Sequence, residues 1–155
     1  MTAQIGDVLL FAGKRFALAS EPLAPWLQRR RNRHLRLRGN TTANRRGYVA
    51  EWEVVDGLLH LKQIVGKLLD DTPLEVQTLF PDATGPVPAT WFTGGLRCPM
   101  GKMLRYVHGG YDTVREYDLI LWFIEGQLVE QRLNRNRVPQ DITPDDDDLE
   151  AELED

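Results

Sequence analysis

The stretch that decides the fold runs from Tyr48 to Val65 and reads YVAEWEVVDGLLHLKQIV. β-Branched and aromatic residues favour strands on both sides of Asp56-Gly57, and this dipeptide is typical of a type I′ turn because glycine accepts positive φ. The sequence therefore predicts a two-residue hairpin. Its register places Val54 opposite Leu59 and Trp52 opposite Leu61 on one face, and Glu53 opposite His60 and Glu51 opposite Lys62 on the other.

Three more hairpins are predicted around this one. The clearest spans Asp118–Leu133 and turns at Glu125-Gly126, with Phe123 opposite Leu128 and Trp122 opposite Val129. Its first strand is apolar on both faces, which favours a central position in a covered sheet. The other two join Trp91–Arg97 to Met103–Val107 through Pro99–Lys102, and Asp7–Phe11 to Arg15–Ala19 through Ala12–Lys14.

Helix is scarce in this pattern. Thr72 as N-cap and Pro73 as the first helical residue predict one short helix ending near Phe80, and Pro25–Arg31 predicts another. The fold class expected is α+β, β-dominated, with an antiparallel sheet built from successive hairpins. We expect a single globular domain over residues 1–138 and an acidic C-terminal tail over 139–155, either a frayed helix or disordered.

Charge is sorted into two blocks of opposite sign. Residues 29–46 hold eight arginines and no acid, whereas residues 141–155 hold nine acids and no base. Each block is a candidate to meet a charged partner. The arginine block also allows a solvated loop or a counter-charge for the tail, and the sequence pI near 5.4 argues against a dedicated nucleic-acid binder.

Few residues suit catalysis. His60 is explained by its predicted pairing with Glu53, whereas His108 precedes the turn Gly109-Gly110 and has Arg105, Tyr106, Tyr111 and Glu116 near it in sequence. Two interpretations of His108 remain open: a general acid/base at a strand end, or a histidine satisfied by hydrogen bonds at a tight turn, which we prefer. Cys98 has no base beside it in sequence, so we expect a half-buried strand thiol.

The sequence predicts no metal site and no cofactor, because it has no Cys/His cluster, no EF-hand spacing and no phosphate-binding glycine motif. A single cysteine suits a reducing compartment and no apolar run is long enough for a membrane span, so we expect a cytoplasmic protein without membrane contact. No catalytic residue is assigned. The candidate binding residues are Arg46, Tyr48, Arg105, Tyr106, His108, Tyr111, Asp145, Asp146, Asp147 and Asp148.

From Thr41 onward the chain resembles a family of small bacterial proteins without an established activity. The resemblance covers about two thirds of the chain and is carried by Thr42-Ala43-Asn44, Arg46-Gly47-Tyr48, Trp52-Glu53, Trp91-Phe92-Thr93-Gly94, Leu96-Arg97, Pro99, Gly101-Lys102, Tyr106-Val107-His108 and Gly110-Tyr111. Arg45 departs from the pattern, where a bulkier apolar or aromatic residue is usual. Small acidic bacterial domains of this kind are often the neutralising partners of toxins, which is an analogy at the level of class.

These observations lead to a non-enzymatic protein-binding module as the expected function, with an immunity-type inhibitor of a bacterial toxin as its specific form. Its partner would be a basic toxin or effector domain. The first alternative is an RNA- or phosphate-binding protein that uses the Arg29–Arg46 block. The second is a small enzyme centred on His108.

Overall fold

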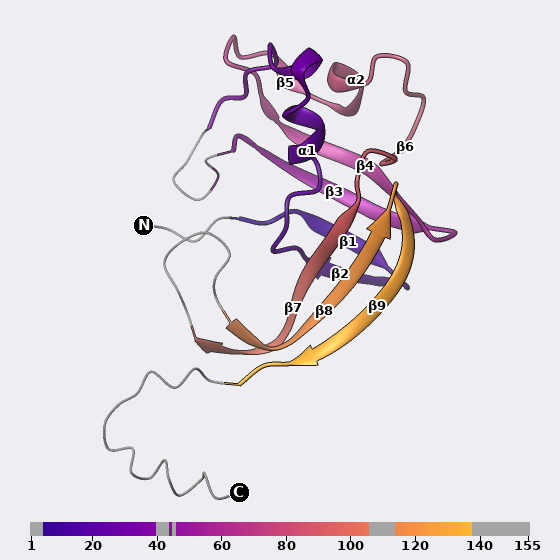
Figure 1. The fold of residues 1–155 in the computed structure, drawn as a ribbon. Coiled ribbons are helices and arrows are strands. Elements are labelled where there is room, and N and C mark those ends of the chain that lie inside the picture. Colours follow the sequence, from indigo (N-terminus) through magenta and orange to yellow (C-terminus); the bar gives the residue numbers. More distant parts are fainter. Residues whose placement is uncertain (1–4, 40–43, 45, 106–113, 138–155) are drawn as a thin grey trace, which may run out of the picture.

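The computed structural model describes residues 5–39, 44, 46–105 and 114–137 (Figure 1). Strands dominate it, so the predicted β-dominated α+β class is confirmed. The strands are β1 (Val8–Phe11), β2 (Lys14–Ala17), β3 (Tyr48–Val55), β4 (Leu58–Lys67), β5 (Pro73–Leu74), β6 (Val87–Pro88), β7 (Gly94–Arg105), β8 (Val114–Ile124) and β9 (Gln127–Arg135). The helices are α1 (Ala24–Leu27) and α2 (Val76–Leu79), with a 3₁₀ turn over Arg30–Asn32.

All nine strands belong to one mixed sheet with the order β2-β1-β3-β4-β9-β8-β7, and β5 and β6 add to β4. Neighbours are antiparallel except β1 and β3, which are parallel. The two ends of this order also meet, because Ala19 N, just after β2, donates to Arg97 O of β7 at 2.8 Å, and Arg97 N donates to Ser20 Oγ at 3.0 Å. The sheet therefore curls around its core, with α1 and α2 beside β3 and β4 and the curved β7-β8-β9 layer extending away from the helices (Figure 1).

The central hairpin β3-β4 has the predicted two-residue turn. Asp56 and Gly57 have φ of 54° and 77°, as a type I′ turn requires. The pairs Val54–Leu59, Glu53–His60 and Trp52–Leu61 are all present. The predicted pairing of Glu51 with Lys62 is wrong: a bulge makes Lys62 the extra residue, so Glu51 lies opposite Gln63.

The hairpin β8-β9 turns at Glu125-Gly126 as predicted, with Phe123 opposite Leu128. A bulge again changes the next pair, so Trp122 lies opposite Glu130 and Val129 is the extra residue. β8 is central among β7, β8 and β9, but its outer face is not covered within the described part of the chain. Trp122 and Ile124 are 43% and 56% exposed, which corrects the expectation of a sheet covered on both faces.

Two local predictions fail for identifiable reasons. Pro99–Lys102 is not a hairpin turn: β7 runs continuously along β8, and Gly101, at φ 83°, lies in an irregular, bulged part of the pairing. Thr72 does not cap a helix, because Pro73–Leu74 pairs with β4 as β5. The α2 helix starts later, where Glu75 and Thr78 form a reciprocal capping box.

The core is aromatic at its helical end. The ring centre of Trp26 in α1 lies 4.5 Å from that of Phe80 and 6.2 Å from that of Trp91. Trp91 in turn packs edge-on against Trp52 of β3. Trp91 Nε1 donates to Pro22 O at 2.9 Å, so its polar group is satisfied inside this cluster. The cluster fixes the segment that leads into the arginine block.

Candidate functional site

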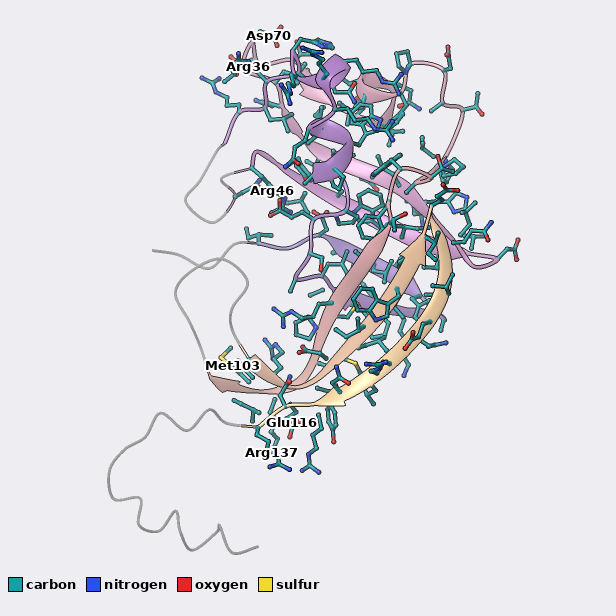
Figure 2. All side chains as sticks on the ribbon, in the orientation of Figure 1. Arg36, Arg46, Asp70, Met103, Glu116 and Arg137 are labelled. Atoms are coloured by element: carbon teal, nitrogen blue, oxygen red, sulfur yellow. The ribbon has the colours of Figure 1, made fainter. Side chains whose placement is uncertain are left out.

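Six exposed arginines follow α1 and form what we term the arginine surface: Arg29, Arg30, Arg31, Arg33, Arg36 and Arg38. The first four lie on and around the 3₁₀ turn, and the last two lie on the extended segment after it. Figure 2 shows Arg36 at the helical end of the molecule, close to Asp70. The surface therefore belongs to the end of the fold that carries the aromatic cluster.

Buried anchors hold this segment in place. Asn32 is only 8% exposed, and its side-chain Nδ2 donates to Trp26 O at 2.7 Å. After the turn, Leu35 and Leu37 pack against the core, whereas Arg36 and Arg38 point outward with the alternation of a strand. Backbone bonds complete the attachment, with Arg38 N donating to Lys67 O and Leu69 N to Arg36 O, both at 2.9 Å.

The charge of the arginine surface is largely uncompensated within the described part of the chain. Arg38 pairs with Asp71, and Arg33 Nε reaches Gln28 O at 3.5 Å. No described carboxylate forms an ion pair with the remaining members: Arg29, Arg30, Arg31 and Arg36. Their guanidinium groups are exposed and available to an acidic partner.

A cavity of about 440 Å³ adjoins this surface. It is lined by Arg38, Gly39, Val65, Gly66, Lys67 and Asp71. Its cations are the Arg38 guanidinium, held by Asp71, and the exposed Lys67 ammonium. Because Asp71 offsets the charge of Arg38, Lys67 is the one cation of this lining that no described carboxylate pairs with.

Arg46 and Tyr48, two of the predicted binding residues, have structural contacts. Arg46 Nη2 lies 2.6 Å from Oδ1 of the fully buried Asp7, and its guanidinium sits 4.8 Å above the Tyr48 ring centre. Asp7 also accepts from Ala50 N at 3.0 Å and from Trp52 Nε1 at 2.9 Å. Burial raises the pKa of the Asp7 carboxyl, and the Arg46 guanidinium opposes that shift. A role for either residue in partner binding stays a prediction.

Of the other predicted site residues, only Arg105 is described, and its backbone pairs with Val114 at the end of β7. Tyr106, His108 and Tyr111 lie outside the described residues, as do Asp145, Asp146, Asp147 and Asp148 of the acidic tail. Glu116, which could have joined a His108 site, accepts from Lys102 N at 2.9 Å and packs at the Gly101 bulge. The general acid/base interpretation of His108 thus stays a prediction.

Cys98 is fully buried, more than the half-buried position expected. Burial and the nearby Asp118 carboxylate raise the pKa of the Cys98 thiol to about 12, so the thiol stays protonated at neutral pH. A protonated buried thiol is a poor nucleophile. This agrees with the interpretation of Cys98 as a packing residue.

Sequence reasoning missed Asp7 as the centre of a buried network. The sequence shows only an acid before an apolar strand, and its three donors lie 39 to 45 positions away. Contacts at that separation leave no local pattern. A hint was available in Trp52, since a buried indole N–H needs an acceptor.

Among residues 5–39, 44, 46–105 and 114–137, no cluster of three His, Cys, Asp or Glu side chains could hold a metal ion. No helix in the same part of the chain is long and apolar enough to cross a membrane. Comparison of the chain with family models, with curated proteins and with solved structures gives no match in any of the three.

Proposed function

We propose that this protein is a non-enzymatic protein-binding module that recognises its partner through strong local charge. The observation that supports this most directly is the arginine surface, whose guanidinium groups are exposed and mostly lack a described carboxylate partner. A salt-bridge network that served the fold would pair these groups, as Arg46 pairs with Asp7. Charge that the fold leaves unpaired is suited to steering a partner and fixing its orientation.

The arginine surface and Arg137, the last described residue before the acidic segment, lie at different ends of the fold. Figure 2 shows Arg36 at the helical end, and Arg137, the last described residue, at the far end of the β7-β8-β9 layer. The nine acids of residues 141–155 follow Arg137 in the chain. An acidic region of a partner suits the arginine surface, and a basic region suits residues 141–155.

The specific form of this proposal is an immunity-type inhibitor of a bacterial toxin, acting in the cytoplasm. In that form the acidic segment 141–155 covers a basic active site on a toxin or effector domain. Nine carboxylates concentrated in fifteen residues suit such a target, because attraction between opposite charges raises the association rate and blocks the site to anionic substrates.

The test is affinity capture from the native host with the full chain, a chain lacking 141–155, and a chain whose acids in that segment are replaced by Asn and Gln. The expected result is one basic protein held by the full chain only, with an association rate that falls as salt rises. A captured partner that binds all three chains equally would contradict a role for the acidic segment.

The second candidate function, RNA or phosphate binding, is favoured by the same exposed guanidinium groups and the cavity beside Lys67. A labelled single-stranded RNA of about 20 nucleotides provides the assay, because phosphate contacts give a steep salt dependence. Arg29→Gln, Arg30→Gln and Arg31→Gln combined should weaken RNA binding if this alternative holds. Unchanged RNA affinity in that variant would exclude the arginine surface as an RNA site.

A further inference from the structure

Within the described part of the chain, β9 is unpaired along most of one edge, which we term its free edge. On one side it pairs with β8 from Gln127 to Arg135. On the other side it meets β4 only at Leu58–Gln127, with Leu59 N donating to Gly126 O and Leu128 N to Gly57 O, both at 2.8 Å. No described element pairs with residues 129–135 on that side, and all seven are exposed. Such an edge is a template for another strand.

The opposite edge of the same three-stranded layer is protected. β7 carries Pro99, the bulged Gly101 and Lys102. Near its start, the backbone O and N of Arg97 are hydrogen-bonded to Ala19 N and Ser20 Oγ. Proline, bulges and charged side chains, lysine above all, are the usual means by which proteins prevent edge-to-edge pairing. The charged side chains of β9, Glu130, Arg132 and Arg135, are of both signs. Residues 130–135 of β9 contain no proline, glycine or lysine, and the one bulge lies before them, at Val129. The two edges therefore differ in whether pairing is discouraged.

The free edge is also complementary to itself. Residues 129–133 read Val-Glu-Gln-Arg-Leu. When two such strands run antiparallel with Gln131 opposite Gln131, each Glu130 lies opposite an Arg132. Leu133 of each strand then lies beside Val129 of the other, where the β8-β9 bulge interrupts the regular alternation. Apolar and opposite-charge pairs are those that stabilise neighbouring strands.

The charges also select this register. Sliding one strand by two residues places Arg132 opposite Arg132 or Glu130 opposite Glu130, and like charges directly opposite are destabilising. Glu130 and Arg132 already form an ion pair within β9, with Arg132 Nη2 2.9 Å from Glu130 Oε2. Both side chains therefore lie on one face of the sheet. Across a twofold axis, Glu130 of one copy can reach Arg132 of the other.

We propose that two copies of this chain associate through β9, antiparallel and centred on Gln131. The two three-stranded layers then form a continuous sheet, β7-β8-β9-β9-β8-β7, and Val129 and Leu133, 57% and 58% exposed in the single chain, pack against each other. A pairing of five residues is about 17 Å long. This small contact places the dimer in the weak class, with dissociation over the micromolar range.

The experiment is sedimentation velocity of the full chain from about 1 to 300 µM, the range of a weak association. The unmodified chain should change from monomer to dimer over this range. Glu130→Arg and Arg132→Glu should each be at least about tenfold weaker, because each places like charges across the axis. The double variant Glu130→Arg/Arg132→Glu should dimerise as the unmodified chain does, since it restores both pairs with the charges exchanged. A mixture of the two single variants should form a heterodimer.

Cross-linking tests the register independently. Gln131→Cys should form an intermolecular disulfide on mild oxidation, because its twofold mate lies directly opposite. Asn134→Cys is the matched control: in this register the two copies of residue 134 lie about 20 Å apart along the edge, so no disulfide should form. The buried Cys98 does not compete. A chain that stays monomeric throughout, a double variant as weak as the single ones, or equal cross-linking at 131 and 134 would each overturn the proposal.

Discussion

Removing Asp7 tests whether the buried ion pair organises the domain. Asp7→Ala leaves the Arg46 side chain, 10% exposed, without its carboxylate, and it leaves Ala50 N–H and Trp52 Nε1–H without their acceptor. Breaking a buried pair from one side costs about 3–5 kcal/mol, and each orphaned donor costs a further 1–3 kcal/mol or so. We expect at least about 5 kcal/mol of lost unfolding free energy, a large part of the roughly 5–15 kcal/mol typical of a domain.

The partner variant Arg46→Met should cost less, about 3 kcal/mol, because Asp7 keeps two donors and can become neutral by taking up a proton. Burial raises the pKa of Asp7 in the folded state above its ordinary value of 3.8. The folded state therefore binds this proton more readily than the unfolded state, so the contribution of Asp7 to stability falls as pH rises from 3.8 through the folded pKa. Without Arg46 the folded pKa rises further, so Arg46→Met should recover stability, relative to the unmodified chain, as pH falls from neutral toward 3.8.

Urea unfolding followed by tryptophan fluorescence gives the free energy of unfolding of each variant and its dependence on pH. Asp7→Asn/Arg46→Met serves as the control, because the neutral amide at position 7 imitates the protonated carboxyl and should make the double variant more stable than Arg46→Met alone. An Asp7→Ala loss below about 1 kcal/mol would refute the reasoning, since breaking a buried pair costs several times more. A loss of stability in Arg46→Met that does not change as pH falls toward 3.8 would show that the Asp7 carboxyl does not respond to the guanidinium.

Three further predictions follow from the core, the thiol and the tail. Trp52→Ala should cost about 3–5 kcal/mol in urea unfolding, because the indole is fully buried against Trp91; a near-neutral effect would contradict this packing. Cys98 should resist a thiol reagent at about pH 8 until urea unfolds the domain, since its pKa is about 12; rapid labelling of the native chain would disprove its burial. Deleting 141–155 should change the melting temperature by no more than about 2 °C, because the buried core lies entirely within the described residues before this segment. Cooperative unfolding lost on deletion would show that the segment is part of the fold.

Local chemistry explains why some of this fold was predictable. The two-residue hairpin turns Ala12-Gly13, Asp56-Gly57 and Glu125-Gly126 all have glycine at the position with the larger φ. The β3-β4 pairing near Asp56-Gly57 follows from the residues on each side. The errors begin at bulges. Lys62 and Val129 are extra residues in their strands, and the composition around them looks the same with or without a bulge. A register read outward from a turn is therefore reliable only as far as the first bulge.

For the arginine surface, the sequence predicts the composition but not the geometry. The run of arginines is evident in the sequence, but its geometry is set by Asn32, Leu35 and Leu37, whose contacts are with the aromatic core. The exposed face of β8 could not be predicted, because Leu119–Ile124 has the composition of a covered strand. Whether such a strand is covered depends on contacts between segments far apart in the sequence, such as the bond from Ala19 N, after β2, to Arg97 O of β7.

The separation of the two surfaces makes their proposed roles independent. The arginine surface lies beside β3, β4 and the helices, whereas the free edge of β9 continues toward Arg137 at the other end (Figure 2). A dimer through β9 therefore leaves both arginine surfaces exposed. Two linked arginine surfaces bind a partner with an extended or repeated acidic region more tightly than one does. Once the first surface is bound, binding of the second is intramolecular. Glu130→Arg should then weaken binding to such a partner only at protein concentrations where the unmodified chain is dimeric, whereas substitutions in Arg29–Arg31 should weaken it at every concentration.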